Sequence, residues 1–426
     1  MRTIRFASSL LILFALLLTA CEAIAPTPTP TPVPLSPPQH VESAFQWLET
    51  HAMLQDNVDW DALRRDTAGI IANAHTTAET IPAICLALQH LQDGNAWLLI
   101  PGLEVPNFYT GYYTLYPEDK IIIQIDPASP AEKAGLRVGD VIEKIDGLPP
   151  KPATDFAHYP PCNTEAIVAN TQEHLTLLRN GELVQVVVEK VKLTSGKDIY
   201  NRPNGRRSDA KASGIGYMEL TLDSGHSQYP GDVQTIMRKL DQTPVCGWVI
   251  DLRRNSGGDI WTYIAAVGPI LGEGELGGFV YLDGAREAWA YHDGKVFWNN
   301  EYRYESAVDG PIYKPKRVTP VALLASPATQ AAAELVLVAF QGRMGVRTFG
   351  ESTRGLPTLV THTNLSDGSS VFVSGADSYD RDGKIYNSSI SPDVTVATNW
   401  SQFGTTQDPV INAATGWLQS QSDCMP

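Results

Sequence analysis

The chain has 426 residues, of which 43% are hydrophobic and 19% are charged, enough to bury a core in each of two or three domains. Its 47 acidic and 32 basic residues give a net charge of −15. A field of that sign repels phosphate backbones and argues against nucleic-acid binding. We interpret the acidity as that of a soluble, exported surface.

The N-terminus has the pattern of an export signal. Arg2 and Arg5 precede an apolar run, Leu10 to Leu18, that is too short to span a bilayer and fits the apolar region of a signal peptide. The residues Leu-Thr-Ala then precede Cys21, as in the lipobox of bacterial lipoproteins, where the cysteine is acylated and becomes the new N-terminus. An ordinary secretory signal with a chance cysteine is the alternative. We expect residues 1–21 to be a lipoprotein signal and Cys21 to be lipidated.

Residues 22–38 are rich in alternating proline and threonine. Proline fixes φ and lacks an N–H donor, so this segment favours an extended polyproline II conformation. It is typical of a semi-rigid tether that holds a globular body away from a membrane. We therefore predict a lipid-anchored protein outside the cytoplasm, at the bacterial cell envelope, and the sequence leaves its oligomeric state open.

Four more cysteines follow Cys21, and their spacing matches no metal site. An oxidising compartment permits disulfides. We expect Cys85 and Cys246, which lie in apolar runs, to be buried thiols. A bridge between Cys162 and Cys424 remains open.

Secondary-structure signals divide the body into an α/β multidomain protein. Apolar residues at helical spacing predict a helical cap at residues 39–105, and its last helix is expected to end at Asp93-Gly94. Short strands, a helix beginning near Pro130 and an Asn-Gly hairpin predict a β domain at residues 106–192. Strands alternate with helices in residues 193–400 and predict an α/β core with parallel strands. Residues 401–426 predict one more helix and a tail, whereas residues 272–278, rich in glycine, predict a flexible loop.

The β domain resembles a PDZ domain of the circularly permuted bacterial kind. Residues 127–147 carry its small-residue and proline run, then Ala-Gly-Leu, Gly-Asp-Val-Ile and Asp-Gly. The resemblance implies that an extended polypeptide or a protein C-terminus adds a strand to the sheet, with its carboxylate held near Tyr109, Gly111, Tyr112 and Tyr113. A PDZ domain that only spaces or gates other parts is the alternative.

Residues 251–258, with the sequence Asp-Leu-Arg-Arg-Asn-Ser-Gly-Gly, end a buried strand just before a helix. Such a turn exposes amides that can stabilise an oxyanion. Together with Gly-Glu-Ser-Thr-Arg-Gly at residues 350–355, it resembles the C-terminal-processing (tail-specific) serine peptidase family, and the match spans roughly residues 41–400. The resemblance implies a crotonase-like α/β peptidase core, proteolysis of extended or C-terminal polypeptide, no cofactor and no metal, with oxyanion donors at Gly257, Gly258 and Ala332.

The catalytic positions depart from that family. The nucleophilic serine lies three residues before the glutamate that Glu334 matches, and here that position is Ala331. One branch uses a lysine base at the position of Leu356. The other branch, which resembles the tricorn core, uses a histidine at the position of Asn95 and a glutamate in the region where Asn387 lies. An engineered change would explain Ala331 alone, whereas the joint absence of histidine and glutamate favours natural degeneration.

These replacements remove the groups that acyl transfer needs, a hydroxyl and a base. Alanine has no nucleophile, and an amide is not basic near neutral pH. We therefore predict a catalytically impaired member of the family, acting as a peptide-binding pseudopeptidase or scaffold. An active peptidase with a relocated or engineered site and a purely structural envelope component are the alternatives. The candidates for a relocated Ser–His pair are Ser326, Thr329, Ser352, His226 and His292.

Overall fold

The computed structural model describes residues 35–103, 108–115, 120–150, 162, 171–192, 204–207, 214–222, 227–305 and 311–424. The predicted signal peptide with Cys21, and most of the proline-threonine tether, lie outside these residues. No helix within the described ranges has the length and apolar character needed to cross a membrane.

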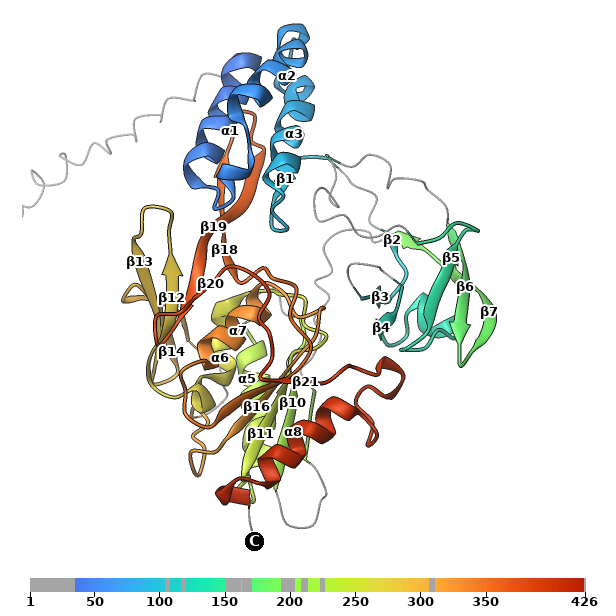
Figure 1. Ribbon diagram of the computed structural model, residues 1–426, viewed down its shortest axis with the longest axis vertical. Coiled ribbons are helices and arrows are strands. Elements are labelled where there is room, and N and C mark those ends of the chain that lie inside the picture. Colours follow the sequence, from blue (N-terminus) through green and yellow to red (C-terminus); the bar gives the residue numbers. More distant parts are fainter. Residues whose placement is uncertain are drawn as a thin grey trace, which may run out of the picture. The chain divides into compact units, whose positions relative to one another are not determined.

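Helices form the first part of the described chain (Figure 1). They are α1 (Pro37–His51), η1 (Gln55–Asn57), α2 (Trp60–Asn73), η2 (Thr77–Thr80) and α3 (Ile81–Leu91). Phe45 and Leu88 are buried in their core, and so are Val371 and Val373, which come from a strand almost 300 residues later in the chain. The core of the helices therefore includes residues outside the predicted module at 39–105.

Short strands follow, arranged as three small sheets, and two of these sheets, β3-β4 and β5-β6-β7, share one apolar core. The elements are β2 (Phe108–Tyr109), β3 (Tyr112–Thr114), β4 (Ile122–Ile125), α4 (Pro130–Lys133), β5 (Val141–Ile145), β6 (Gln172–Arg179), β7 (Glu182–Glu189) and β8 (Val191–Lys192). Asn180 and Gly181 both have positive φ, 52° and 85°, as the predicted Asn-Gly hairpin between β6 and β7 requires. The Ser129 hydroxyl accepts a hydrogen bond from Glu132 N–H and so caps α4.

A six-stranded sheet forms the larger core, in the order β21-β17-β16-β11-β10-β9. All neighbours in it are parallel except the edge strand β9. The strands are β9 (Asn204–Arg207), β10 (Ile215–Glu219), β11 (Gly247–Asp251), β16 (Val321–Ala325), β17 (Val346–Gly350) and β21 (Val394–Thr395). This confirms the parallel α/β core that the alternation of strands and helices predicted.

Helices cover both faces of this sheet (Figure 1). Trp248 and Ile250 of β11 pack against α5 (Tyr229–Leu240), α6 (Ile260–Leu271) and α7 (Ala332–Phe340). Val249 points to the opposite face, where α8 (Pro409–Gln419) packs through Val410 and Leu418. Because strand side chains alternate between faces, a buried strand between two helical layers is largely apolar, as β11 is up to its last residue, Asp251.

A second, antiparallel sheet has the order β1-β19-β12-β13-β14-β15, and β18 and β20 both pair with β19. Its strands are β1 (Trp97–Leu99), β12 (Gly274–Val280), β13 (Arg286–His292), β14 (Lys295–Trp298), β15 (Glu301–Glu305), β18 (Thr358–Asn364), β19 (Ser370–Asp380) and β20 (Ile385–Tyr386). The flexible loop predicted for residues 272–278 is therefore wrong. A Cβ on Gly277 would lie 2.3 Å from the Tyr379 carbonyl oxygen, so the glycine serves close approach of β19 rather than flexibility.

Two disulfides correct the expectations for the cysteines. Cys85 pairs with Cys162, and Cys246 pairs with Cys424, so neither Cys85 nor Cys246 is a free thiol and the bridge between Cys162 and Cys424 does not form. An apolar run around a cysteine predicts that its sulfur is buried, but it does not distinguish a free thiol from a disulfide. The spatial neighbour decides between them, and here the paired Cα atoms lie 5.3 Å and 4.9 Å apart.

Candidate functional site

Ala331, the predicted nucleophile position, lies on a sharp turn between β16 and α7. It is the residue before the first turn of α7, it is partly exposed, and its backbone has φ 51° and ψ −122°. A side chain other than hydrogen is strained at such a positive φ, at a cost of about 1–3 kcal/mol. Strained backbone of this kind is concentrated at functional sites, where surrounding contacts hold it in place.

Glu334 holds this turn in place. Its carboxylate accepts hydrogen bonds from Ala331 N–H at 2.9 Å, from the Thr353 hydroxyl at 2.5 Å, and from the amides of Gly355 and Leu356 at 2.8 Å each. Burial raises the pKa of Glu334, and the hydrogen bonds oppose that shift. The carboxylate therefore joins the start of α7 to the turn at residues 353–356.

The turn at residues 255–258 lies directly against Ala331. Gly257 and Gly258 have φ 115° and 123°, and a Cβ built on Gly257 would lie 3.2 Å from the Ala331 Cβ. Gln330 N–H donates to the Asn255 carbonyl oxygen at 3.2 Å, which ties the two turns together. The structure thus brings the predicted oxyanion turn and the predicted nucleophile position side by side.

The three predicted oxyanion donors differ in their bonding. Gly257 N–H already donates to the Asn255 side-chain oxygen at 3.0 Å. Within the described ranges, the N–H groups of Gly258 and Ala332 have no hydrogen-bond acceptor. These two amides are the ones that a bound carbonyl oxygen would meet first, and their role stays a prediction.

Asn95, the predicted base position, belongs to a network of hydroxyls. Its side-chain NH₂ donates to the Thr358 hydroxyl at 2.9 Å and to the Ser374 hydroxyl at 3.2 Å. Asp93 accepts from the Ser374 hydroxyl at 2.9 Å and from Asn95 N–H at 2.9 Å. Asn95 is an amide, and Thr358 and Ser374 are hydroxyls, so none of these three groups would take a proton from a nucleophile at neutral pH.

The network borders a pocket of about 310 Å³. Leu356, the position of the lysine in the other branch, lines it, and a Cβ on Gly94 would lie 2.8 Å from a Leu356 methyl group. Asn387, the predicted position of the orienting acid, also lines it and hydrogen-bonds to the carboxylate of Asp377.

Sequence reasoning missed Asp377, the acidic neighbour of Asn387. Asp377 lies in β19, and burial raises its pKa. The signal was one of two acidic residues, Asp377 and Asp380, in a strand otherwise built of small, aromatic and aliphatic side chains. That signal does not predict which face of the strand the carboxylate lies on. The position of Asp377 in the pocket lining could therefore be found only from the folded structure.

The predicted peptide-carboxylate loop contains a carboxylate of its own. The hydroxyls of Tyr109 and Tyr113 donate to one oxygen of Asp126 at 2.6 Å and 3.0 Å. Tyr112 donates instead to Glu173 at 2.8 Å. Gly111 has φ 82°, and a Cβ there would lie 2.1 Å from the Ser129 Cβ, so close backbone approach requires glycine at this position. The role of these residues in peptide binding stays a prediction.

The candidates for a relocated nucleophile serve other contacts. The Ser326 hydroxyl donates to the Arg253 carbonyl at 2.6 Å, and the Thr329 hydroxyl donates to the Leu252 carbonyl at 2.9 Å. Ser352 contacts the Ser391 hydroxyl at 3.3 Å, and His292 faces Glu273 at 3.5 Å on the surface. His226 lies outside the described residues. In the part of the chain that the structure covers, no three His, Cys, Asp or Glu side chains are placed to hold a metal ion.

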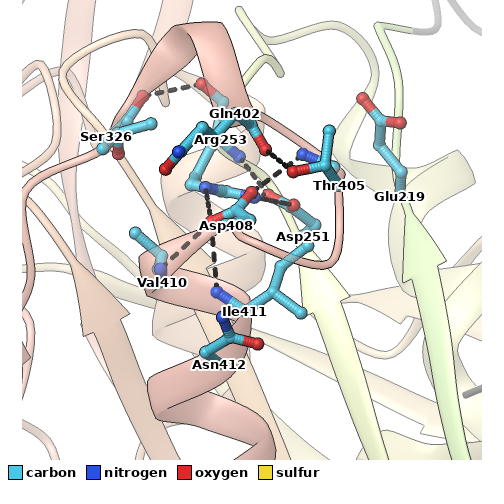
Figure 2. A network of polar contacts seen from close by, with 12 residues as sticks. Glu219, Asp251, Arg253, Ser326, Gln402, Thr405, Asp408, Val410, Ile411 and Asn412 are labelled. Carbon is cyan, nitrogen blue, oxygen red and sulfur yellow. Dashed lines mark hydrogen bonds and ion pairs between the residues drawn. The ribbon is translucent and has the colours of Figure 1, made fainter.

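A buried ionic network lies at the end of β11, just before the turn at residues 255–258 in the chain (Figure 2). The Arg253 guanidinium is fully buried between Asp251 and Asp408, at 2.7 Å and 2.8 Å, and lies 4.5 Å from the centre of the Phe403 ring. Burial opposes ionisation of Asp251, but the charge and hydrogen bonds of Arg253 outweigh it and lower its pKa. Asp408 also caps α8, so this network joins the end of β11 to the C-terminal helix.

Replacing Ala331 by glycine is expected to raise the free energy of unfolding by about 1 kcal/mol, because glycine adopts a positive φ without strain. Replacing Ala333, two residues further into α7, is the matched control. Glycine there is expected to lower the stability by about 1 kcal/mol, as in any helix. Urea unfolding measures both, and a loss of stability at both positions would contradict strain at Ala331.

Comparisons with known proteins identify two domains in the chain. A peptidase family S41 domain matches residues 214–396, and a PDZ domain matches residues 121–159. The chain is 28% identical to the nisin-resistance protein of Lactococcus lactis subsp. lactis over 202 residues, 47% of this chain and 57% of the relative. It is 25% identical to the chloroplastic C-terminal processing peptidase of Tetradesmus obliquus over 287 residues, 65% of this chain and 56% of the relative. The chain thus spans a little over half the length of these relatives.

The fold has a solved counterpart in the photosystem II D1 C-terminal processing protease. The two share 22% identity and a TM-score of 0.55, over 85% of this chain and 94% of that chain. This likeness shows a common fold across most of both molecules. The chain therefore carries a peptidase family S41 domain and a PDZ domain, and its homologues include C-terminal-processing peptidases.

Proposed function

We propose that this chain is a lipid-anchored envelope protein that binds extended polypeptides or C-termini without hydrolysing them at the rate of a peptidase. The anchor would be a lipid on Cys21, followed by the proline-threonine tether, as the N-terminal sequence indicates. The polypeptide would lie along the S41 core beside Ala331, and the PDZ domain would contribute strand pairing.

One observation carries the loss of catalysis. The turn at Ala331 keeps a strained backbone held by Glu334, yet its side chain is a methyl group. A strained turn is retained only where the surrounding contacts dictate it, and here it presents nothing able to attack a carbonyl. The two positions at which the family has a base are an amide, Asn95, that donates to hydroxyls, and an apolar side chain, Leu356. An intact oxyanion site without nucleophile or base would retain at most about 10³–10⁴-fold over water.

Polypeptide binding is supported by backbone amides beside Ala331 that do not depend on the missing catalytic side chains. The amides of Gly258 and Ala332 have no acceptor within the described ranges, so a backbone carbonyl of a bound chain would satisfy them. One relative is named a C-terminal processing peptidase, and a peptidase acts on polypeptides. The pocket lined by Gly355 and Leu356, whose amides share the Glu334 carboxylate with Ala331 N–H, offers space for a side chain of such a segment.

Crosslinking to a cysteine at position 331 tests this proposal. The four cysteines at 85, 162, 246 and 424 form two disulfides, so in an Ala331→Cys variant that also carries Cys21→Ser the new cysteine is the one free thiol. We expect an extended peptide with an internal bromoacetyl group to react with it at least about tenfold faster than free bromoacetamide does. An excess of an unlabelled unfolded protein should suppress that rate enhancement.

The matched control is Asn300→Cys in the same background, which places an exposed thiol on the turn between β14 and β15. Its reaction with the peptide should match its reaction with bromoacetamide and should not respond to competitor. Equal peptide selectivity at positions 331 and 300 would refute binding of the polypeptide beside Ala331.

A further inference from the structure

The pocket of about 310 Å³ that the Asn95 network borders is formed where the segment after α3 meets β18, β19 and the turn at residues 353–356. We propose that this pocket binds a lysine or arginine side chain of the bound polypeptide, and that Asp377 selects it. The inference rests on the proposed function, because it names the kind of segment that the site would hold.

Asp377 is a half-buried carboxylate that lacks a cationic partner among the described residues. Its one hydrogen-bond partner there is the side chain of Asn387. Burial raises the pKa of Asp377, because the ionised form has lost part of its hydration without gaining a cation. A bound ammonium or guanidinium group would replace that hydration with a charge-assisted hydrogen bond.

The other charged groups in the pocket lining are Asp93 and Arg354. Both oxygens of Asp93 are already used, by Ser374 and by Asn95 N–H. Two carboxylates and one guanidinium give the lining a formal charge of −1, which favours a cation over the carboxylate of a peptide C-terminus. Arg354 is also engaged in other contacts, since its N–H donates to the Thr329 carbonyl and the residue has a further partner.

The apolar part of the lining fits the stem of such a side chain. Met53, Leu54 and Leu356 line the same pocket as Asp377. Lysine and arginine bury their methylene stems against apolar surface while their charged ends reach a polar group. The volume is at the lower end for ligand pockets, which suits one side chain rather than a larger molecule.

Peptide selectivity tests the assignment. The full chain in detergent is titrated into fluorescent extended peptides that differ at one central residue, which is lysine, arginine, glutamine or glutamate. We expect the lysine and arginine peptides to bind at least about tenfold more tightly than the glutamine peptide, as one charge-assisted hydrogen bond would give. Asp377→Asn should abolish this preference, so that the lysine, arginine and glutamine peptides bind within about twofold of one another.

The matched control is Asp382→Asn, an exposed carboxylate on the turn between β19 and β20, which should keep the preference. Asp377→Lys should reverse it in favour of the glutamate peptide. Three outcomes would each overturn this inference but not the proposed function. They are equal binding of the lysine and glutamine peptides, a preference that survives Asp377→Asn, and tightest binding of the glutamate peptide to the unchanged chain. If no peptide of any sequence binds, both the proposed function and this inference are overturned.

Discussion

A variant that carries Ala331→Ser and Asn95→His is expected to cleave an unfolded protein at least about 100-fold faster than the unchanged chain. A hydroxyl at position 331 would stand on a turn that is already strained and held by Glu334, directly against Gly257. In a serine peptidase, loss of the nucleophile or the base costs about 10⁶-fold in kcat, so recovery of even a small share of that factor is measurable. The rate of appearance of new peptide termini, followed by mass spectrometry, measures the gain.

The two single variants are the controls for this gain. A serine without a base and a histidine without a nucleophile are each expected to leave the rate near that of the unchanged chain, because the two groups act as a unit. Ser326→Ala in the unchanged chain should also have no effect on cleavage, because that hydroxyl is bonded to the Arg253 carbonyl. If the unchanged chain cleaves as fast as the double variant, the proposal that this chain has lost its catalytic activity is wrong.

Replacement of Arg253 by methionine is expected to lower the free energy of unfolding by about 3–5 kcal/mol. The change removes the cation that lies between Asp251 and Asp408 and leaves two carboxylates buried without it. Because Arg253 lowers the pKa of Asp251, the stabilisation is fully present at neutral pH and is lost as the pH falls below the ordinary pKa of Asp. Urea unfolding at pH 7 measures the loss.

Arg303→Met is the matched control, since Arg303 also lies over an aromatic ring, Trp298, but its ion pair with Glu301 is exposed. Its loss is expected to be below about 1 kcal/mol. Addition of Asp251→Asn and Asp408→Asn to the Arg253→Met chain should recover part of the stability, because the unpaired charges are then removed. Equal losses for the two arginine variants would show that the buried network does not stabilise the fold.

Much of the fold was predictable because local patterns and the final structure agree. The alternation of buried strands and apolar helices in β10, α5, β11 and α6 predicted the parallel sheet. The second sheet was not predictable in the same way, since β12 contains three glycines and its pairing with β19 joins residues about 100 positions apart. Distant pairing of this kind depends on the whole fold and leaves no local periodicity.

The candidate site was likewise predictable from the sequence only where a local motif defines it. The position of Ala331 and the glycine turn were predictable from motifs, and the structure brings them together. The hydroxyl network around Asn95 and the contact between Asp377 and Asn387 depend on side chains from separate elements. The cysteine pairs were missed for the same reason, because each joins segments 77 or 178 residues apart.

The most direct test of the emptied site is the mass of a polypeptide recovered from its complex with the unchanged chain. An unfolded protein is incubated with the full chain, the complex is isolated by size, and the intact mass of the bound partner is measured. Binding without hydrolysis predicts that the partner is recovered at full length after many hours. Recovery of shortened fragments, produced at a rate proportional to the amount of this chain and unchanged by Ala331→Gly, would contradict it and place a working nucleophile elsewhere.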